Sequence, residues 1–458
     1  MSTTPAPRPS GGEPSRPPGD EPAPRPSGDE PDVLVVGAGI VGLFCAWFLA
    51  RDGHRVTVVD RGEVGDPAAC SSGNTGFVGT QGSAPLAEPG VPAKGLRYLL
   101  NPESPFHIRP RWDPALLAWL WHFRRLCTEA DARAAFEILL SLKQRSLAIL
   151  HEVCAAGPLA DTLTAQGMLL ACKTPEGFEQ ARRSVPAAVA RGVPLRVLEP
   201  GELARLEPGV EFDVAGALLN AEGAALRIPA FLVEFARVLR GMGVDIRTHT
   251  EVRDFEVAGD RVRAVRTSRG DLRPAEVVIA AGIWSVACAR KLGLDLMLQP
   301  AKGYAVTVAA PETPPRLPIL LSEGKVAVMP LGDRLRLAGT LELTGMDVSV
   351  SPRRVDGIAR TVRSYLPGLD TDRRVQVWSG LRPCTPDSLP LLGRAGAYRN
   401  VCVAAGHGHI GMGLAPAGGQ LIAQLVGGVR PELDLAPFAV DRWRRRFPRR
   451  RPTPGSTR

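Results

Sequence analysis

Three glycines near the start of the chain have the G-x-G-x-x-G spacing that suits contact with a diphosphate. Gly37 would allow a tight turn, Gly39 would let the backbone approach a pyrophosphate, and Gly42 would let a helix pack closely against a strand. Ile40 and Val41 would begin that helix, whose free N–H groups and positive dipole end would point at the phosphates. These residues predict a site for an ADP-containing dinucleotide.

The segments around the glycines have the patterns that such a site requires. A β-branched run at 33–36 precedes them, a helical run follows, and a second β-branched run at 56–59 ends at Asp60. Asp60 is placed to accept hydrogen bonds from the adenosine ribose, with Arg61 next to it, and its charge would repel a 2′-phosphate. NADP is therefore disfavoured, whereas NAD and FAD both remain open. The uncharged run 33–50 could span a membrane by hydropathy, but the strand-turn-helix pattern inside it argues against this.

Further glycine-rich strand ends occur far along the chain. Residues 276–282 form an apolar run that ends at Gly282, and a strand at 244–252 precedes it and ends at Val252. A simple NAD dehydrogenase keeps its dinucleotide domain contiguous, so this separation favours the longer cofactor FAD. The third cluster, at 405–413, contains Gly408, His409, Gly411, Met412 and Gly413.

Charge and composition exclude some classes of function. The chain has 458 residues and a net charge of +9, but residues 442–458 alone contain eight arginines and no acid. The remainder is nearly neutral, which argues against a nucleic-acid-binding protein. Residues 1–31 are rich in Pro, Gly and Ser, and predict a disordered leader rather than a secretory signal. We expect 442–458 to be a disordered Arg-rich tail.

Cysteine and histidine spacings predict no metal site. The eight cysteines include no C-x-x-C pair, and the seven histidines include no H-E-x-x-H pattern. Scattered cysteines in a chain without a secretory signal are typical of reduced core residues. We therefore expect a cytoplasmic protein, with peripheral contact at the inner face of the membrane left open.

Seven segments occur in an order that is typical of one family. They are VLVVGAGIVG (33–42), CSSGNTGFVG (70–79), LLNPESPFHIRPR (99–111), VVIAAGIWS (277–285), LQPAKGYAV (298–306), GLRPCTPDSLPLLGR (380–394) and AAGHGHIGMGLAPAGG (404–419). Together they resemble the FAD-dependent D-amino-acid dehydrogenase and oxidase family, which also contains glycine and sarcosine oxidases. The resemblance covers residues 32–441 and is greatest to the bacterial D-amino-acid dehydrogenase branch.

The resemblance implies an α/β fold with two domains. A discontinuous Rossmann-type FAD-binding domain would comprise 32–86, 223–298 and 375–441. A substrate domain built on a largely antiparallel sheet would comprise 87–222 and 299–374. The flavin ring would lie where the two domains meet.

The chemistry implied is oxidative deamination of a D-amino acid to a 2-oxo acid and ammonia, by hydride transfer from Cα to flavin N5. Arg382 matches the family position that holds the substrate carboxylate, and a guanidinium can bind it through two hydrogen bonds. Tyr304 would line the pocket, although a core-packed ring is the alternative. His107 stands where relatives commonly have Tyr, and it is a further pocket candidate.

Other residues would contact the flavin. Ser71, Ser72 and Asn74 suit pyrophosphate or ring contacts, and the backbone of the third glycine cluster suits the reduced ring, which is negatively charged. Cys70 and Cys384 are not where a covalent flavin linkage is expected, so we expect FAD to be bound non-covalently.

The electron acceptor remains open between a quinone and oxygen. A helical face at 112–127, with Leu116, Trp119, Leu120 and Phe123, would pack on the substrate-domain sheet or contact a membrane, where quinones reside. The alternatives in function are a glycine, sarcosine or cyclic imino acid (D-proline-like) oxidase that uses oxygen, and a non-catalytic flavoprotein scaffold.

Overall fold

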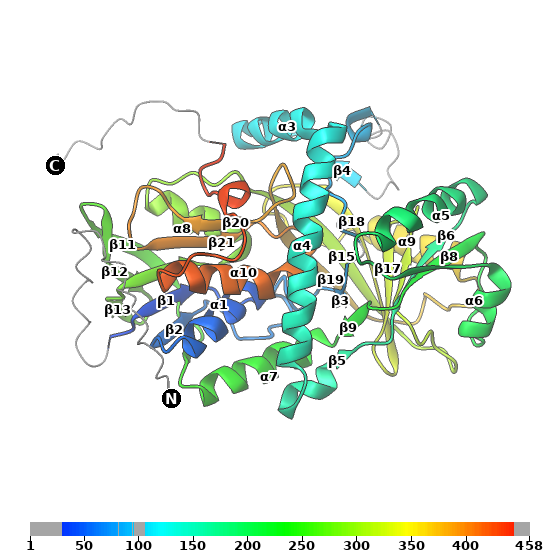
Figure 1. Ribbon diagram of the computed structural model, residues 1–458, viewed down its shortest axis with the longest axis horizontal. Coiled ribbons are helices and arrows are strands. Elements are labelled where there is room, and N and C mark those ends of the chain that lie inside the picture. Colours follow the sequence, from blue (N-terminus) through cyan, green and yellow to red (C-terminus); the bar gives the residue numbers. More distant parts are fainter. Residues whose placement is uncertain (1–29, 81, 94, 96–105, 444–458) are drawn as a thin grey trace, which may run out of the picture.

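Figure 1 shows a computed structural model of the chain, which describes residues 30–80, 82–93, 95 and 106–443. Two large sheets lie side by side, one with six strands and one with nine. The long helix α4 (Glu129–Val153) crosses between them. The predicted leader lies outside the described residues except for its last two positions, as does the predicted tail except for its first two.

The six-stranded sheet has the order β10-β2-β1-β14-β21-β20, and all neighbours are parallel except β20 and β21. The central strands β1 and β2 are short and buried on both faces, which explains their continuous β-branched runs. The bounds of the six strands are β1 (Val33–Val36), β2 (Val56–Val59), β10 (Asp245–Arg247), β14 (Glu276–Ile279), β20 (Leu391–Arg394) and β21 (Val401–Ala405).

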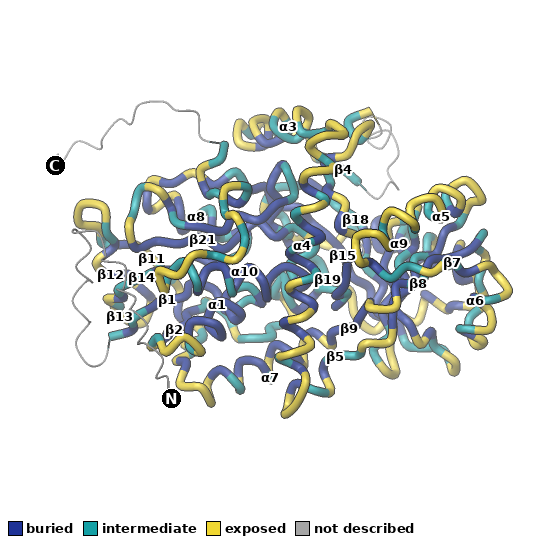
Figure 2. Tube along the Cα trace, in the orientation of Figure 1, coloured by how far each residue is buried: buried dark blue, intermediate teal, exposed yellow. Residues whose placement is uncertain are grey.

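Helices cover one face of this sheet, and a small sheet and a short helix cover the other. The first layer contains α1 (Ile40–Arg51), α7 (Ile228–Gly241) and α10 (Gly411–Val426), whose apolar side chains form one core with those of α4. The second layer contains β11 (Val252–Ala258), β12 (Arg261–Thr267), β13 (Gly270–Leu272) and α8 (Ser285–Lys291). In Figure 2 the central strands and the inner sides of α1 and α10 are buried.

The nine-stranded sheet is antiparallel except for the pairs β16–β6 and β18–β4. Helix α9 (Pro352–Tyr365) packs on one face of β15, β17 and β18. The strands are β4 (Phe106–Ile108), β6 (Met168–Cys172), β7 (Leu195–Leu198), β8 (Gly216–Asn220), β15 (Gln299–Ala309), β16 (Ile319–Leu321), β17 (Val326–Pro330), β18 (Arg334–Leu343) and β19 (Arg374–Cys384).

Smaller elements flank the two large sheets. Helix α3 (Pro114–Leu126) lies across the ends of β15 and β4, and α5 (Pro175–Val189) and α6 (Pro200–Leu206) flank the outer strands. A three-stranded sheet contains β3 (Phe77–Val78), β9 (Ala224–Leu226) and β5 (Leu163–Thr164). The predicted fold class, a Rossmann-type sheet beside a largely antiparallel one, is confirmed.

Two elements differ from the expected domain boundaries. Strand β19 was expected with the FAD-binding segments, but it pairs with β15 along its length and so belongs to the nine-stranded sheet. Helix α4 was expected in the substrate domain, but its buried face packs on α10 and joins the core of the six-stranded sheet. Long-range strand pairing and helix packing decide both positions, and neither is visible in the local sequence.

The first two residues of the predicted tail are anchored. Arg442 is mostly buried and forms an ion pair with Asp387 at 2.9 Å, and Trp443 lies beside His122 of α3 with 6.4 Å between ring centroids. The expectation of a disordered end is therefore wrong at these two residues. The uncharged run 33–50 divides into β1 and α1, and none of the helices in the described part of the chain is long and apolar enough to span a membrane.

Candidate active site

A cavity of about 810 Å³ lies between the two sheets. The start of α1, the loop 70–79, the segment 404–413, and one face of β18 and β19 form its walls, and α3 and β4 close one end. Twelve of the predicted site residues line it: Gly39, Ile40, Val41, Ser71, Asn74, Gly282, Arg382, Gly408, His409, Gly411, Met412 and Gly413.

The glycine motif is held in one conformation at the N-terminus of α1. Gly37 has a φ of +112°, and a Cβ there would lie 2.6 Å from the carbonyl oxygen of Ala280. A Cβ on Gly42 would lie 1.8 Å from the oxygen of Gly37, so close helix–strand packing requires glycine. The N–H of Ile40 donates to Ser71 Oγ at 3.2 Å, which brings the 70–79 loop to the helix start. This cradle of small residues and N–H groups fits a diphosphate.

Asp60 fixes the same motif from outside the cavity. Its Oδ2 accepts a hydrogen bond from the N–H of Ala38 at 2.7 Å, and its Oδ1 accepts one from Gly62 at 2.9 Å. Arg61 stacks on the ring of Trp284 at 4.2 Å. Val252 begins β11, two residues after Thr250, whose N–H donates to the Asp60 carbonyl at 2.6 Å. Asp60 and Arg61 therefore follow the end of β2, and Val252 begins the neighbouring strand β11. None of these three residues lines the cavity.

The segment before α10 forms the opposite wall. Gly411, Met412 and Gly413 begin this 16-residue helix at the cavity surface. Burial lowers the pKa of His407 to about 4, so its imidazole is neutral at pH 7. His409 is exposed at the cavity wall, and its pKa is also lowered, by partial desolvation together with the charges of Arg382 and Lys143. A helix start next to neutral histidines favours negative charge placed against it.

Arg382 reaches the cavity from β19. Its Nη1 donates to the carbonyl oxygen of Thr340 at 2.7 Å, and its guanidinium covers Gly303, where a Cβ would clash with it. Among the described residues no carboxylate lies within ion-pair distance of it, and burial lowers its pKa. Two cysteine thiols, Cys70 and Cys384, are near, and burial raises their pKa to about 11 and about 12, so they stay protonated. The site therefore presents a cation to an anionic ligand.

A β-bulge positions the acceptor for Arg382. Between Lys302 and Tyr304 of β15 the register shifts, so that β18 has one extra residue there. Thr340 lies in this bulge with a φ of +64°, an uncommon conformation for a residue with a Cβ. Sequence reasoning missed Thr340, and β-branched residues give no local signal of a left-handed conformation.

Lys143 is a second cavity residue that sequence reasoning missed. It lies on α4 among buried apolar residues and is 4% exposed. Its side chain lies 3.8 Å from where a Cβ on Gly413 would be, at the start of α10. Burial lowers its pKa to about 7. The available signal was its spacing, since Leu139, Lys143, Ser146 and Leu150 follow the period of one helical face.

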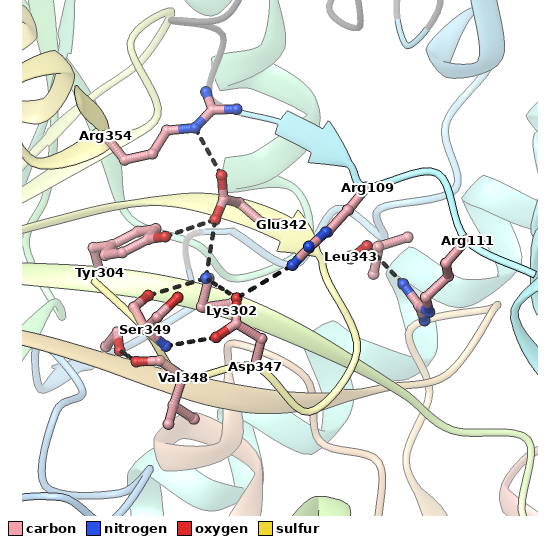
Figure 3. A network of polar contacts seen from close by, with 11 residues as sticks. Arg109, Arg111, Lys302, Tyr304, Glu342, Leu343, Asp347, Val348, Ser349 and Arg354 are labelled. Carbon is pink, nitrogen blue, oxygen red and sulfur yellow. Dashed lines mark hydrogen bonds and ion pairs between the residues drawn. The ribbon is translucent and has the colours of Figure 1, made fainter. Parts of the chain in front are cut away.

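Tyr304 and His107 do not reach the cavity. The hydroxyl of Tyr304 donates to Glu342 at 2.7 Å, within the buried polar network of Figure 3 on the opposite face of the sheet. Side chains alternate along a strand, so Tyr304 must face away from Gly303, which contacts Arg382. On β4 the neighbours of His107, Phe106 and Ile108, line the cavity instead. The expected pocket role of both residues is corrected on this geometry.

Ser72 also faces away from the large cavity. Its neighbours Ser71 and Gly73 line that cavity, whereas Ser72 lines a smaller one beside Arg336. Gly37 and Gly42 lie behind the motif and act through the close packing described above. The predicted set therefore divides into residues at the cavity wall and residues that support it.

A family model described as "FAD dependent oxidoreductase" matches residues 32–425. The chain belongs to this family. Among its relatives are D-amino acid dehydrogenases of Paramagnetospirillum magneticum, 36% identical over 90% of this chain and 98% of that protein, and of Rhizorhabdus wittichii, 32% identical over 90% and 100%. A glycine oxidase from Geobacillus kaustophilus superposes with a TM-score of 0.69 at 27% identity, covering 90% of this chain and 98% of that one. An L-proline dehydrogenase from P. horikoshii, at 19% identity and a TM-score of 0.68, shares the fold.

FAD is therefore the cofactor of this oxidoreductase. The residues present fit it, because the cavity runs from the glycine cradle at α1 to the helix start at α10 and on to Arg382. Gly39, Ile40 and Ser71 would hold the pyrophosphate, and the backbone of 408–413 would face the ring system.

Proposed function

We propose that this enzyme oxidises a D-amino acid to the 2-oxo acid and ammonia, with Arg382 binding the substrate carboxylate. The observation that carries the proposal is the guanidinium of Arg382, which lies at the wall of the cofactor cavity with no carboxylate partner among the described residues. The relatives described above are D-amino acid dehydrogenases, which supports a D-amino acid as substrate. Bound FAD supplies a hydride acceptor, N5 of its ring.

The residues of the chain position the substrate and exclude water. The Thr340 carbonyl and the flat surface of Gly303 hold Arg382 so that its other N–H groups remain for a carboxylate. No side-chain base is required when the amine enters neutral, and the neutral His407 and His409 leave the amine without a nearby imidazolium. The N–H groups at the start of α10 would stabilise negative charge on the cofactor side.

The walls beyond Arg382 favour a substrate with an apolar side chain. Phe106, Ile108, Leu120, Phe123 and Leu341 line that part of the cavity. Apolar walls exclude water and gain free energy from an apolar substituent, about 25 cal/mol per Å² buried. We therefore infer a preference for larger apolar D-amino acids over glycine. A glycine or sarcosine oxidase is the second candidate, because the glycine oxidase cited above shares the fold.

An anaerobic spectroscopic screen tests this function. The enzyme with FAD would be mixed without oxygen with D-amino acids, their L-enantiomers, glycine, sarcosine and D-proline, and flavin absorbance would be followed near 450 nm. Rapid bleaching by D-leucine or D-phenylalanine, but not by the L-enantiomers, is expected. Bleaching by glycine or sarcosine alone would favour the second candidate, and no bleaching by any amine would contradict both.

We infer that the electrons pass to a membrane quinone, because the outer side of α3 suits contact with lipid. On this helix Leu117 and Trp121 are 50% and 46% exposed, and Arg125 stacks on Trp121 at 4.6 Å. Trp112, two residues before the helix begins, is 90% exposed. The inner side of the same helix lines the cavity with Trp119, Leu120 and Phe123. Exposed tryptophans beside arginines suit the interface of an anionic membrane.

Flotation with vesicles tests the membrane contact. The wild type should float with phosphatidylglycerol vesicles, and the double variant Trp112→Ser, Trp121→Ser should bind them more weakly. Equal flotation of both would contradict a role for α3. Reduction of a soluble quinone without peroxide release in air would support the acceptor, whereas stoichiometric peroxide would indicate an oxidase.

A further inference from the structure

A second cavity, of about 110 Å³, lies beside the large cavity of about 810 Å³ described above. It is bounded by the loop that contains Gly65, Pro67 and Ser72 on one side, and by the nine-stranded sheet on the other, through Arg336 and Trp378. Pro67 is exposed, so the cavity lies close to the surface. Trp378 lies between the two cavities and lines both.

Three buried hydrogen-bond donors at this cavity have no partner. They are Arg336 Nε, Ser72 Oγ and Trp378 Nε1. Arg336 is 9% exposed and Ser72 is 3% exposed. Guanidinium and indole nitrogens can only donate, and buried donors without acceptors are rare and costly in folded proteins. These donors come from two separate parts of the fold, so the cavity is a built polar site.

The charge of Arg336 is also uncompensated. Its Nη1 donates to the carbonyl oxygens of Ser72 and Asn74, each at 2.9 Å, which satisfies only one of its nitrogens. In the described part of the chain, no carboxylate forms an ion pair with it. Burial lowers its pKa, because removing the guanidinium from bulk water disfavours its charged form.

Water alone would leave the charge at this site uncompensated. A water molecule can accept from Arg336 Nε and Trp378 Nε1 and donate to Ser72 Oγ, but it cannot neutralise the guanidinium. A small anion accepts from all of them and neutralises the guanidinium. The volume is sufficient for one such ion and too small for an organic cofactor or a nucleotide.

We propose that this cavity is a binding site for a small inorganic anion, held by Arg336, Ser72 and Trp378. By accepting hydrogen bonds from Ser72 in the loop and from Arg336 and Trp378 in the nine-stranded sheet, the anion would hold the loop against the sheet. Ser72 follows Ser71, whose Oγ accepts from Ile40 at the cradle, so the anion would also stabilise the loop next to the pyrophosphate. A ligand that binds the folded form raises the unfolding temperature by mass action.

The first test locates the ion. Crystals of the enzyme with FAD would be soaked in bromide, and anomalous scattering would be measured at the bromine edge. A peak in the small cavity, in contact with Arg336 and Trp378, is expected. Ordered water there with no anomalous peak would overturn the proposal.

The second test measures binding in solution. The unfolding temperature of the enzyme with FAD would be followed against sodium chloride and, separately, sodium phosphate, with sodium gluconate keeping ionic strength constant. Saturable stabilisation by at least one of the two anions is expected, and comparison of their half-saturating concentrations identifies the better ligand. A bromide peak without saturable stabilisation by either anion would mean binding at crystal concentration only, and would also overturn the proposal.

Variants test whether the stabilisation by anions arises from binding in this cavity. Ser72→Ala and Trp378→Phe each remove one donor but keep the contacts of Arg336 with the loop carbonyls. Each should raise the half-saturating anion concentration by about tenfold, since a hydrogen bond to an ion contributes more than a neutral one. Arg336→Lys should weaken anion binding further. Arg263→Met removes one charge from an exposed position of β12 and should leave the value unchanged. Equal anion responses in all variants would contradict the assignment.

Discussion

Buried cations on the two faces of the strands β15, β18 and β19 have different partners. On the face covered by α9, Lys302 and Arg354 share the carboxylate of Glu342 at 3.6 and 2.7 Å, and Lys302 also pairs with Asp347 at 3.2 Å. On the face that lines the cavities, Arg382 and Arg336 bond to backbone carbonyls instead. The same strands therefore hold a closed network on one side and open cations on the other (Figure 3 shows the closed side).

This difference in partners indicates different roles: the paired cations stabilise the fold, whereas Arg382 and Arg336 can bind ligands. A buried ion pair with further hydrogen bonds is satisfied within the protein and has no capacity left for a substrate. A cation held only by carbonyl dipoles keeps its attraction for an anion that arrives from solvent. The difference predicts that substitutions on the two faces affect different measurements, namely stability on the closed face and ligand binding on the open face.

The largest effect is expected for Arg382→Met. Loss of the cation should lower kcat/KM for D-amino acids by about 30- to 3,000-fold, the range that corresponds to about 2–5 kcal/mol for a buried charge pair. The loss should appear mostly in KM, with FAD content and unfolding temperature little changed. Arg382→Lys should be intermediate, because an ammonium keeps the charge without the two-pronged geometry. An unchanged KM would remove Arg382 from the substrate site.

Glu342→Gln tests the closed face. The change leaves Lys302 and Arg354 buried without their shared carboxylate, and it should lower the free energy of unfolding by about 3–5 kcal/mol. Denaturant unfolding measures this, and KM of the remaining folded enzyme should stay near the wild-type value. Glu152→Gln is the matched control, since its pair with Arg51 is exposed and should contribute at most about 1 kcal/mol. A large KM change in Glu342→Gln would contradict the separation of the two faces.

Lys143→Met tests the pH dependence of a buried cavity lysine. Burial lowers the pKa of Lys143 from 10.5 to about 7, so between these values the unfolded chain binds the proton and the folded chain does not. The wild type therefore loses stability relative to the variant as pH falls from 10.5 to 7. Urea unfolding of both proteins, freed of FAD because a diphosphate would raise this pKa, should show a difference that is greatest near pH 7 and shrinks toward pH 10.5. A difference that does not change with pH would contradict the shifted pKa.

The sequence predicted the cofactor side of the site better than the substrate side. The cradle at Gly37–Gly42 is a local strand-turn-helix pattern, so its residue types and spacing specify its geometry directly. The substrate side depends on the register of β15 against β18 and β19, which pairs Ala301 with Arg382 and forms the bulge at Thr340. Strand register and bulges arise from contacts far apart in the chain, and no local pattern specifies them.

The error at Tyr304 could have been avoided with strand alternation. Gly303 and Arg382 come from two segments that the sequence assigned to the site, and a glycine next to a large residue in a strand marks a place of close approach. If Gly303 faces the ligand, Tyr304 must face the other side. Lys143 was not predicted as a cavity residue for a different reason. A lysine in a long helix is usually expected to be solvated, unless the positions of its neighbours show that it lies on the buried face of the helix.

Tyr304→Phe is the smallest predicted change and the most selective one. Its hydroxyl donates to the Glu342 carboxylate at 2.7 Å, so the variant should lose about 1.5–3 kcal/mol of stability, as for a hydrogen bond to a charged group. Because the phenol lies across the sheet from Arg382, kcat and KM for the D-amino acid should remain within about twofold of wild type, a factor worth less than 0.5 kcal/mol. The comparison with Arg382→Met then becomes decisive. If Tyr304→Phe raised KM strongly at unchanged stability, the hydroxyl would have to reach the substrate. The register of β15 would then differ from the one that keeps Gly303 under Arg382, and the open and closed faces would no longer be separate.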